Sequence, residues 1–301
     1  MRKIEPIDIS NTTISALDKL QSSVNSGKSF DDRKDKAKSL WLSKKSTQEA
    51  AFTEIENNLK TATLPNGICH YCEWNEASEI EHILPKTYFP EQAFIWDNYL
   101  YVCGKCNREK LAHFCIFDPA GSDNVHQLPN PVKGSPATQP PTTDICFIQS
   151  RLDNPMDYLI LDFKTLRFVE LAKLDEATCL SKKRDRAKAE QTLSILDLNR
   201  AVLEPTRRNS LSNYKMHLEW ASKIVKARET RTLANISNVF QSCLTLPNFL
   251  ERKKACLDLV KSAIQKHTFG HPTVWKEMKR QRTFYPDLNQ WFTDCPDALN
   301  W

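Results

Sequence analysis

Apolar residues in the N-terminal part of the chain recur at the spacing of one helical face. They stand among charged residues, and the spacing of three and four is clearest after Thr47: Leu17, Leu20, Leu40, Leu42, Phe52, Ile55 and Leu59. This periodicity is typical of amphipathic α-helices. It predicts two or three helices between Thr12 and about Lys60.

The C-terminal half combines one β pattern with several helical ones. Residues 158–171 form two β-type runs around Lys164-Thr165, which predict a hairpin. The long charged segments that follow, with prolines nearby, predict helices: Asp175 to Leu196, Arg207 to Arg228, Thr232 to Leu244 and Asn248 to His267. The stretch from His271 to Trp301 is rich in aromatic residues, which favours docking onto a core over a base-stacking platform.

The segment between these halves has little helical periodicity. The turn signal Leu64-Pro-Asn-Gly67 places Cys69 and Cys72 on a tight knuckle between short strands, and we expect the order strand, strand, helix, with the helix opening near Asn107. Residues from Asp118 to Thr143 hold many prolines and predict a long irregular connection. The chain thus divides into a helical segment (1–63), a cysteine-containing module (64–117), a Pro-rich connection (118–150) and a hairpin with a helical region (151–301).

Composition indicates a globular protein of a reducing compartment. The 301 residues suffice for a real core, and no apolar run reaches the length of a membrane span. Because no apolar stretch follows the charged N-terminus, we expect no secretory signal, no membrane partner and a cytoplasmic location. There, ten cysteines favour metal binding and free thiols over disulfides. The net charge of +5 is compatible with a polyanionic partner without requiring one.

Two Cys-x-x-Cys pairs carry a strong zinc signature. Cys69 and Cys72 form the first pair, and Cys103 and Cys106 the second. Four thiolates complete a closed tetrahedral shell, so these residues predict a structural Zn²⁺ site. The other six cysteines show no ligand spacing and are expected to pack as ordinary core residues.

Polar residues near these cysteines point to a second kind of chemistry. His82 titrates near neutral pH and is a candidate general base, whereas Glu81 and Asn107 offer hard oxygens suited to Mg²⁺ or Mn²⁺. Neighbouring strand residues face opposite sides, so joint action of Glu81 and His82 predicts a bulge or bend. For Asn107 the alternative is helix capping, and for Asn98 it is a structural turn.

In order along the chain, the motifs C-x-x-C, E-H-x-x-P-K, N and C-x-x-C-N-x-x-K resemble the HNH endonucleases, over roughly Leu64 to Phe117. The resemblance implies a zinc-clamped ββα-metal hairpin, here embedded in a mainly α-helical protein with a small β-hairpin, an α+β fold. It implies His82 as general base, Glu81 as the acidic metal ligand and Asn107 as the second metal ligand. Glu81 stands where Asp is commoner, and its extra methylene affects the metal distance.

The same resemblance implies roles for three further residues. Asn98 matches the central asparagine that ties the loop and orients the histidine. Lys110 falls where a basic residue meets phosphate, and Lys86, which ends the E-H-x-x-P-K motif, is a second candidate for phosphate contact. His70 and His113 have no assigned role.

Further segments resemble the HNH proteins of Septu-type and retron-associated antiphage systems: Met1-Arg-Lys-Ile, His70-Tyr-Cys-Glu73, Ile80 to Lys86 and Arg186 to Arg200. In those systems the nuclease is encoded with an ATPase related to the ABC and SMC families. The resemblance implies such an ATPase as partner, and the helical part of 151–301 is the expected place for its contacts.

Two functional classes remain open. The first is a metal-dependent endonuclease acting on DNA, with RNA (for example tRNA) as the alternative substrate. The second is a non-catalytic zinc-anchored adaptor for nucleic acid or protein. An adaptor needs only the cysteines, so the presence of Glu81, His82 and Asn107 favours the enzyme. The basic runs 28–45 and 182–188 are more typical of solvated helix faces than of phosphate tracks.

Overall fold

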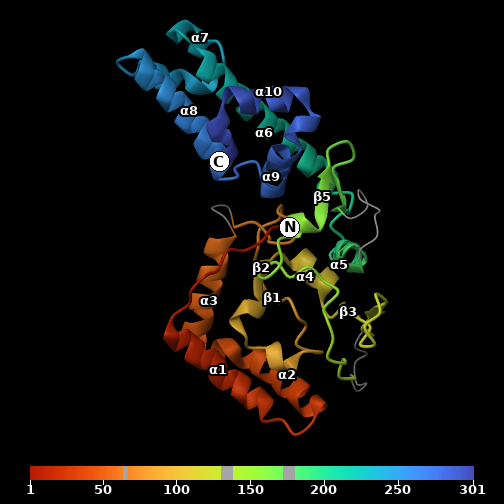
Figure 1. The fold of residues 1–301 in the computed structure, drawn as a ribbon. Coiled ribbons are helices and arrows are strands. Elements are labelled where there is room, and N and C mark those ends of the chain that lie inside the picture. Colours follow the sequence, from red (N-terminus) through yellow and green to blue (C-terminus); the bar gives the residue numbers. More distant parts are fainter. Residues whose placement is uncertain (64–66, 130–137, 172–179) are drawn as a thin grey trace. The chain divides into compact units, whose positions relative to one another are not determined.

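The structure is a computed structural model that describes residues 1–63, 67–129, 138–171 and 180–301, without the side chains of 180–182 (Figure 1). It combines many helices with small antiparallel hairpins. The chain divides after Arg200 into a first unit, Met1–Arg200, and a second unit, Ala201–Trp301. The segments 1–63, 64–117 and 118–150 all belong to the first unit.

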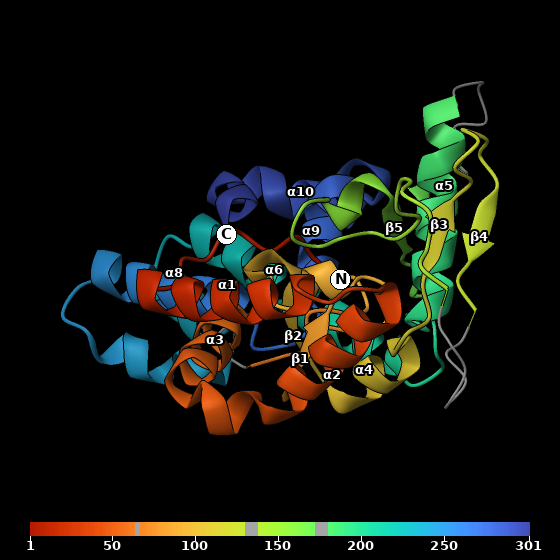
Figure 2. The same ribbon diagram turned by 90° about the horizontal axis from the view of Figure 1, so that it is seen from below.

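Three helices open the first unit, as the apolar spacing predicted: α1 (Asn11–Asn25), α2 (Phe30–Thr47) and α3 (Glu49–Ala62). Two of them start at a serine cap. Ser10 accepts a hydrogen bond from the Thr13 backbone, and Ser29 accepts one from the Asp32 backbone. Such caps satisfy amide groups that the first helical turn leaves without a partner. Figures 1 and 2 show the three helices beside a short hairpin.

That hairpin consists of β1 (Glu79–His82) and β2 (Tyr99–Val102), and α4 (Gly104–Lys110) follows directly. The strands are antiparallel, with Glu79 opposite Val102 and His82 opposite Tyr99. The order strand, strand, helix is the predicted one. The helix begins at Gly104 rather than near Asn107, because the Cys103 sulfur accepts a hydrogen bond from the Cys106 backbone and caps it.

An apolar core joins the helices to the hairpin. Apolar faces of α1 and α3 pack together with Ala37 of α2 and with the loop and strand residues Phe94 and Tyr99. The core residues that these elements share are buried: Leu17, Leu20, Val24, Phe52, Ile55, Leu59 and Ala93. The core therefore holds α2 and β2 in fixed places on either side of the loop that connects the two strands.

The region expected to be an irregular connection contains regular structure. Strand β3 (Cys115–Phe117) pairs antiparallel with β4 (Val125–Gln127), so the prediction of no regular structure from Asp118 onward is wrong at β4. A turn at Asp118, whose carboxylate accepts a hydrogen bond from the Ala120 backbone, reverses the chain between the strands. Residues 130–137 lie outside the described residues.

The predicted hairpin around Lys164-Thr165 is confirmed as β5 (Leu159–Asp162) and β6 (Arg167–Glu170). The helix expected from Asp175 to Leu196 is described as α5 (Leu180–Ile195), and its predicted start lies outside the described residues. It completes the first unit.

The second unit is helical, with α6 (Leu203–Lys226), α7 (Thr230–Ala234), α8 (Phe249–Gln265), α9 (Pro272–Gln281) and α10 (Pro286–Asp294). One expected helix, Thr232 to Leu244, is wrong as a single element. Helix α7 ends at Ala234 and a 3₁₀ helix spans Asn238–Thr245. The reason is Ser237, whose extended backbone and side-chain hydrogen bond to the Val239 amide start a new turn.

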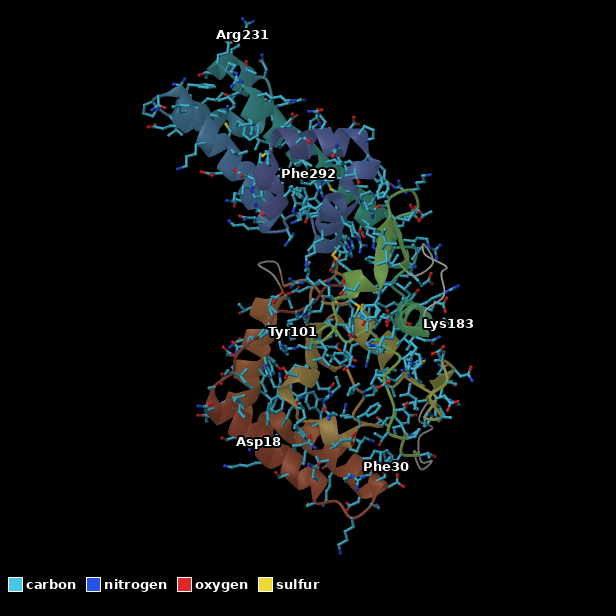
Figure 3. All side chains as sticks on the ribbon, in the orientation of Figure 1. Asp18, Phe30, Tyr101, Lys183, Arg231 and Phe292 are labelled. Carbon is cyan, nitrogen blue, oxygen red and sulfur yellow. The ribbon has the colours of Figure 1, made fainter. Side chains whose placement is uncertain are left out.

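Aromatic residues form much of the core of the second unit. Trp275, Tyr214 and Phe292 are buried, and Figure 3 labels Phe292 among its neighbours. The expectation that the aromatic tail docks onto a core is therefore confirmed for Trp275 and Phe292. No helix in the described part of the chain is long and apolar enough to cross a membrane.

Candidate functional site

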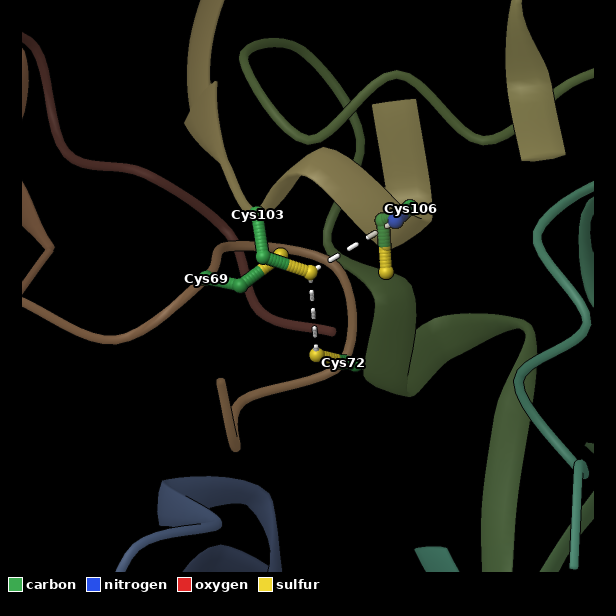
Figure 4. A group of neighbouring side chains, drawn as sticks. All are labelled: Cys69, Cys72, Cys103 and Cys106. Carbon is green, nitrogen blue, oxygen red and sulfur yellow. Dashed lines mark hydrogen bonds between the residues drawn. The ribbon is translucent and has the colours of Figure 1, made fainter. Parts of the chain in front are cut away.

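Four cysteine sulfurs converge beside the hairpin of the first unit. Cys69 and Cys72 lie on the knuckle before β1, which a single bridge between Ile68 and Glu76 closes. Cys103 caps α4 and Cys106 lies in its first turn. All four sulfur atoms lie within 4.8 Å of one another, and the four residues are buried. Figure 4 shows the four side chains close together. The predicted grouping of the four cysteines is confirmed.

The spacing of these sulfurs fits a tetrahedral zinc ion. Zinc–sulfur bonds of about 2.3 Å give a tetrahedron whose edges are about 3.8 Å. The sulfurs of Cys72 and Cys103 are 3.9 Å apart. Four thiolates of this geometry and burial suit structural Zn²⁺, which needs no further ligand.

Two polar side chains contact the sulfurs from outside. The amide of Asn75 donates to the sulfur of Cys103 at 3.8 Å, and the guanidinium of Arg200 donates to the sulfur of Cys106 at 3.7 Å. A zinc ion with four thiolates carries a net charge of about −2, so a guanidinium at this position partly compensates it. Sequence spacing gave no sign of this contact, because Arg200 lies at the far end of the unit.

His70 connects the cysteine knuckle to β2. Its ring nitrogen Nδ1 lies 2.8 Å from the Tyr101 carbonyl, and the side chain is fully buried. Burial, with the nearby charge of Arg2, lowers its pKa to about 3. His70 therefore acts here as a neutral structural link between two backbone segments.

His82 is held from both sides at the end of β1. Its Nε2 atom lies 3.0 Å from the Ala93 carbonyl, which also accepts the Tyr99 hydroxyl at 2.8 Å. The ring packs against Trp41 of α2, with 4.2 Å between ring centroids. These contacts fix the orientation of the imidazole and leave it 5 % exposed.

The contacts of His82 also select its protonation state. A carbonyl only accepts hydrogen bonds, so Nε2 carries the proton and the neutral ring presents Nδ1 as the acceptor. Burial lowers the pKa of His82 well below its usual value, and the charges of Lys86, Lys110 and Lys44 act in the same direction. At neutral pH the ring is thus neutral, which is the form that a general base must have.

Asn98 ties together the loop between β1 and β2. Its side-chain oxygen accepts from the Leu84 amide at 2.7 Å, and its nitrogen donates to the carbonyls of Leu84 (3.1 Å) and Gln92 (2.8 Å). Gln92 precedes Ala93, the hydrogen-bond partner of His82. The buried amide therefore supports the backbone next to the hydrogen-bond partner of His82.

Glu81 faces the opposite side of β1 from His82. The pairing with β2 continues without interruption from Glu79 to His82, so the expected bulge is not present in this ladder. In a regular strand neighbouring side chains alternate between faces. Glu81 accordingly meets α4, where its carboxylate lies 2.6 Å from the ammonium of Lys110.

The burial of Lys110 differs from what phosphate contact requires. Its ammonium also donates to the His82 carbonyl at 2.8 Å, and the side chain is 0 % exposed. In this arrangement Lys110 joins α4 to β1 inside the protein. Lys86 is half-buried, with its ammonium 5.5 Å from the Trp41 ring centroid.

Asn107 contacts Glu79 rather than Glu81. The Asn107 amide nitrogen donates to the Glu79 carboxylate at 2.5 Å. Glu79 lies two residues before Glu81 and so on the same face of β1. Glu79 was not among the predicted site residues, although the alternation Glu79-Ile-Glu81 was the signal for it.

The side-chain oxygens on the Glu79 and Glu81 face of β1 suit a hard cation, but Lys110 occupies part of this place. Carboxylates and amide oxygens are the ligands that Mg²⁺ and Mn²⁺ take. Glu79 and Asn107 are already in contact and partly exposed, whereas the buried Glu81 is engaged by Lys110. Glu81 fits a divalent cation only where the ammonium of Lys110 moves away.

Comparison of the chain with models of known protein families, with curated proteins and with solved structures gave no match.

Proposed function

We propose that this protein is a metal-assisted HNH-type endonuclease that hydrolyses phosphodiester bonds of nucleic acid, with His82 as general base. The observation that carries the proposal is the state of His82, a neutral imidazole whose Nε2 is fixed by the Ala93 carbonyl. Its free acceptor, Nδ1, takes a proton from the attacking water. Burial alone lowers the pKa of a histidine, as it does for His70, so the stronger support is Asn98, which holds the backbone next to the Ala93 carbonyl.

The neighbouring residues support this chemistry in separate ways. The four cysteines hold Zn²⁺, which fixes the turn before β1 to the start of α4. Asn98 keeps the loop in place, and Glu79 or Glu81 with Asn107 hold the Mg²⁺ or Mn²⁺ ion. When bound, this ion neutralises charge on the phosphate and on its leaving oxygen.

The substrate and the partner rest on the sequence resemblance. Similarity to Septu-type and retron-associated proteins favours DNA as substrate and an ABC/SMC-like ATPase as partner in antiphage defence. RNA is the alternative substrate. No contact in the structure distinguishes the two polymers, so both belong in the first assay.

A non-catalytic zinc-anchored adaptor is the second candidate. It is favoured by the cover of Trp41 over His82 and by the engagement of Glu81 with Lys110, which together limit access to both groups. An adaptor of this kind keeps the cysteine site and binds its target without cutting it.

The test is cleavage of supercoiled plasmid and of total RNA by the purified full chain, with and without Mg²⁺ or Mn²⁺. We expect metal-dependent cutting that His82→Ala abolishes without loss of zinc or of folding. His126→Ala is the matched control, because His126 is an exposed histidine of the same unit. Binding without cutting, even with the ATPase and ATP added, would support the adaptor instead.

A further inference from the structure

Helix α2 brings a set of lysines next to His82. Trp41 of α2 packs directly on the imidazole. Lys44 places its ammonium 4.1 Å from the centroid of the Trp41 ring, and Lys86, from the loop after β1, lies 5.5 Å from it. Lys38 precedes Trp41 by three residues, as Trp41 precedes Lys44, so these side chains lie on one helical face.

These lysines differ from the other lysines of α2. Lys34, Lys36 and Lys45 form ion pairs with Asp31, Asp32 and Glu56 respectively. Among the residues that the structure describes, no ion pair involves the three lysines near Trp41: Lys38, Lys44 and Lys86.

The positive charges of Lys44 and Lys38 act on Lys86. Burial lowers the pKa of Lys86, Glu81 raises it, and the charges of Lys44, Lys110 and Lys38 lower it further. Burial lowers the pKa of Lys44 and the charge of Lys45 lowers it further, whereas Glu56 raises it in part. Like charges that lie close together and form no ion pair attract an anion.

The second basic run, on α5, is the opposite case. Arg184 pairs with Asp144 at 2.9 Å, and Arg186 pairs with Glu190 at 3.0 Å. Lys188 lies 3.4 Å from an Asp153 carboxylate oxygen. The two runs look alike in sequence, but these three cations of α5 have acidic partners, whereas Lys38, Lys44 and Lys86 form no ion pair among the described residues.

We propose that Lys38, Lys44 and Lys86 form a phosphate-binding surface that holds the sugar-phosphate backbone of the nucleic acid beside His82. This inference rests on the proposed nuclease function. Lys44 follows Lys38 by six positions of the helix, about 9 Å of axis at 1.5 Å per residue. That length matches roughly two to three nucleotides at 3.4 Å each. Backbone contacts of this kind position the polymer without reading its sequence.

The test measures binding rather than cutting. The full chain with His82→Ala is titrated against fluorescein-labelled duplex DNA and single-stranded RNA at several salt concentrations, by fluorescence anisotropy. Adding Lys38→Ala, Lys44→Ala and Lys86→Ala should weaken binding at least tenfold at low salt. The slope of log K against log salt should fall by about 2.7 for duplex DNA and about 2.1 for a single strand, at 0.9 or 0.7 per phosphate contact.

The control removes the same charge elsewhere on the first unit. Lys3, Lys19 and Lys60 are exposed, and replacing them with alanine should change the slope by much less. Arginine at positions 38, 44 and 86 should restore binding. Thermal melting and zinc content verify that each variant is folded.

The outcomes separate this inference from the proposed function. If the protein binds or cuts nucleic acid and the alanines at 38, 44 and 86 act no more strongly than the control set, the phosphate surface is wrong and the nuclease stands. If the parent chain neither binds nor cuts either polymer, both proposals fail. The polymer whose binding responds more strongly identifies the substrate.

Discussion

The ammonium of Lys110 lies 2.6 Å from the carboxylate of Glu81 inside the first unit. It also donates to the carbonyl of His82, so one side chain of α4 contacts both residues of the Glu-His pair on β1. Burial raises the pKa of Glu81 and lowers that of Lys110, and each charge opposes the shift of the other. The pair therefore stabilises the packing of α4 on the hairpin only while both partners are present.

Replacing Lys110 alone should destabilise the protein strongly. Lys110→Met leaves the carboxylate of Glu81 buried without its partner, which costs about 3–5 kcal/mol in such sites. The free energy of unfolding in urea at pH 7 measures the effect. Lys105→Met is the matched control, because the Lys105–Glu109 pair is exposed and solvent screens it. Equal losses of unfolding free energy in the two variants would show that the buried pair stabilises the protein no more than the exposed one.

The four-cysteine site should bind one zinc ion that the fold depends on. Cys103→Ser removes a ligand that also caps α4, so we expect loss of zinc and a lower melting temperature, since metal binding and folding are linked in small sites. Zinc per chain, measured by mass spectrometry, reports this directly. Cys115→Ser is the control, a buried cysteine outside the cluster. Full zinc content in Cys103→Ser would contradict the site.

Arg200 should slow the release of that zinc. Its guanidinium contacts the sulfur of Cys106, and outer contacts of this kind typically change metal affinity by about 10–100-fold. We expect Arg200→Ala to transfer zinc to a chromogenic chelator faster by roughly that factor. Arg186→Ala, which removes an exposed arginine of α5, should leave the rate unchanged. Identical rates in the two variants would mean that the contact does not support the metal.

Protonation of His82 should weaken the fold at acid pH. Burial holds its pKa below the unfolded value of about 6.5, so between those two pKa values the unfolded chain binds a proton that the folded chain does not. Stability from this residue is therefore lost as pH falls below about 6.5, by about 1.4 kcal/mol per pH unit. His82→Gln should remove that loss.

Urea unfolding at pH 7.5 and 5.5 tests the predicted direction of this pH dependence. The difference in stability between the parent and His82→Gln should shift in favour of the variant at pH 5.5. A difference for His82→Gln that does not change with pH would mean that the imidazole titrates normally.

Local sequence patterns predicted the elements that are determined by residues close together in the sequence. The spacing of apolar residues gave the three N-terminal helices, and the two β runs around Lys164 gave the β5–β6 hairpin. The spacing of the paired cysteines predicted that their four sulfurs lie together, because each pair lies within one tight turn or helix start. The strand β4 was missed because its three residues pair only through the reversal that Asp118 makes.

The surroundings of the candidate site could not be predicted, because they consist of contacts between residues far apart in the sequence. Trp41 and Arg200 reach His82 and Cys106 from distant parts of the unit, and neither has a motif of its own. Lys110 was expected at a phosphate, but its place one helical turn after Asn107 brings it to Glu81 instead. Strand alternation pointed to opposite faces for Glu81 and His82, and the uninterrupted ladder keeps them there.

The most direct test of the central claim is chemical rescue of the proposed base. Plasmid and RNA cleavage with Mg²⁺ is measured for the parent chain, for His82→Gly, and for His82→Gly with added imidazole, each with zinc content and melting temperature verified. We predict that His82→Gly is folded and inactive, and that imidazole restores part of the cutting, because the free base occupies the place of the lost ring beside the Ala93 carbonyl. Undiminished cutting by folded His82→Gly without imidazole would contradict the account.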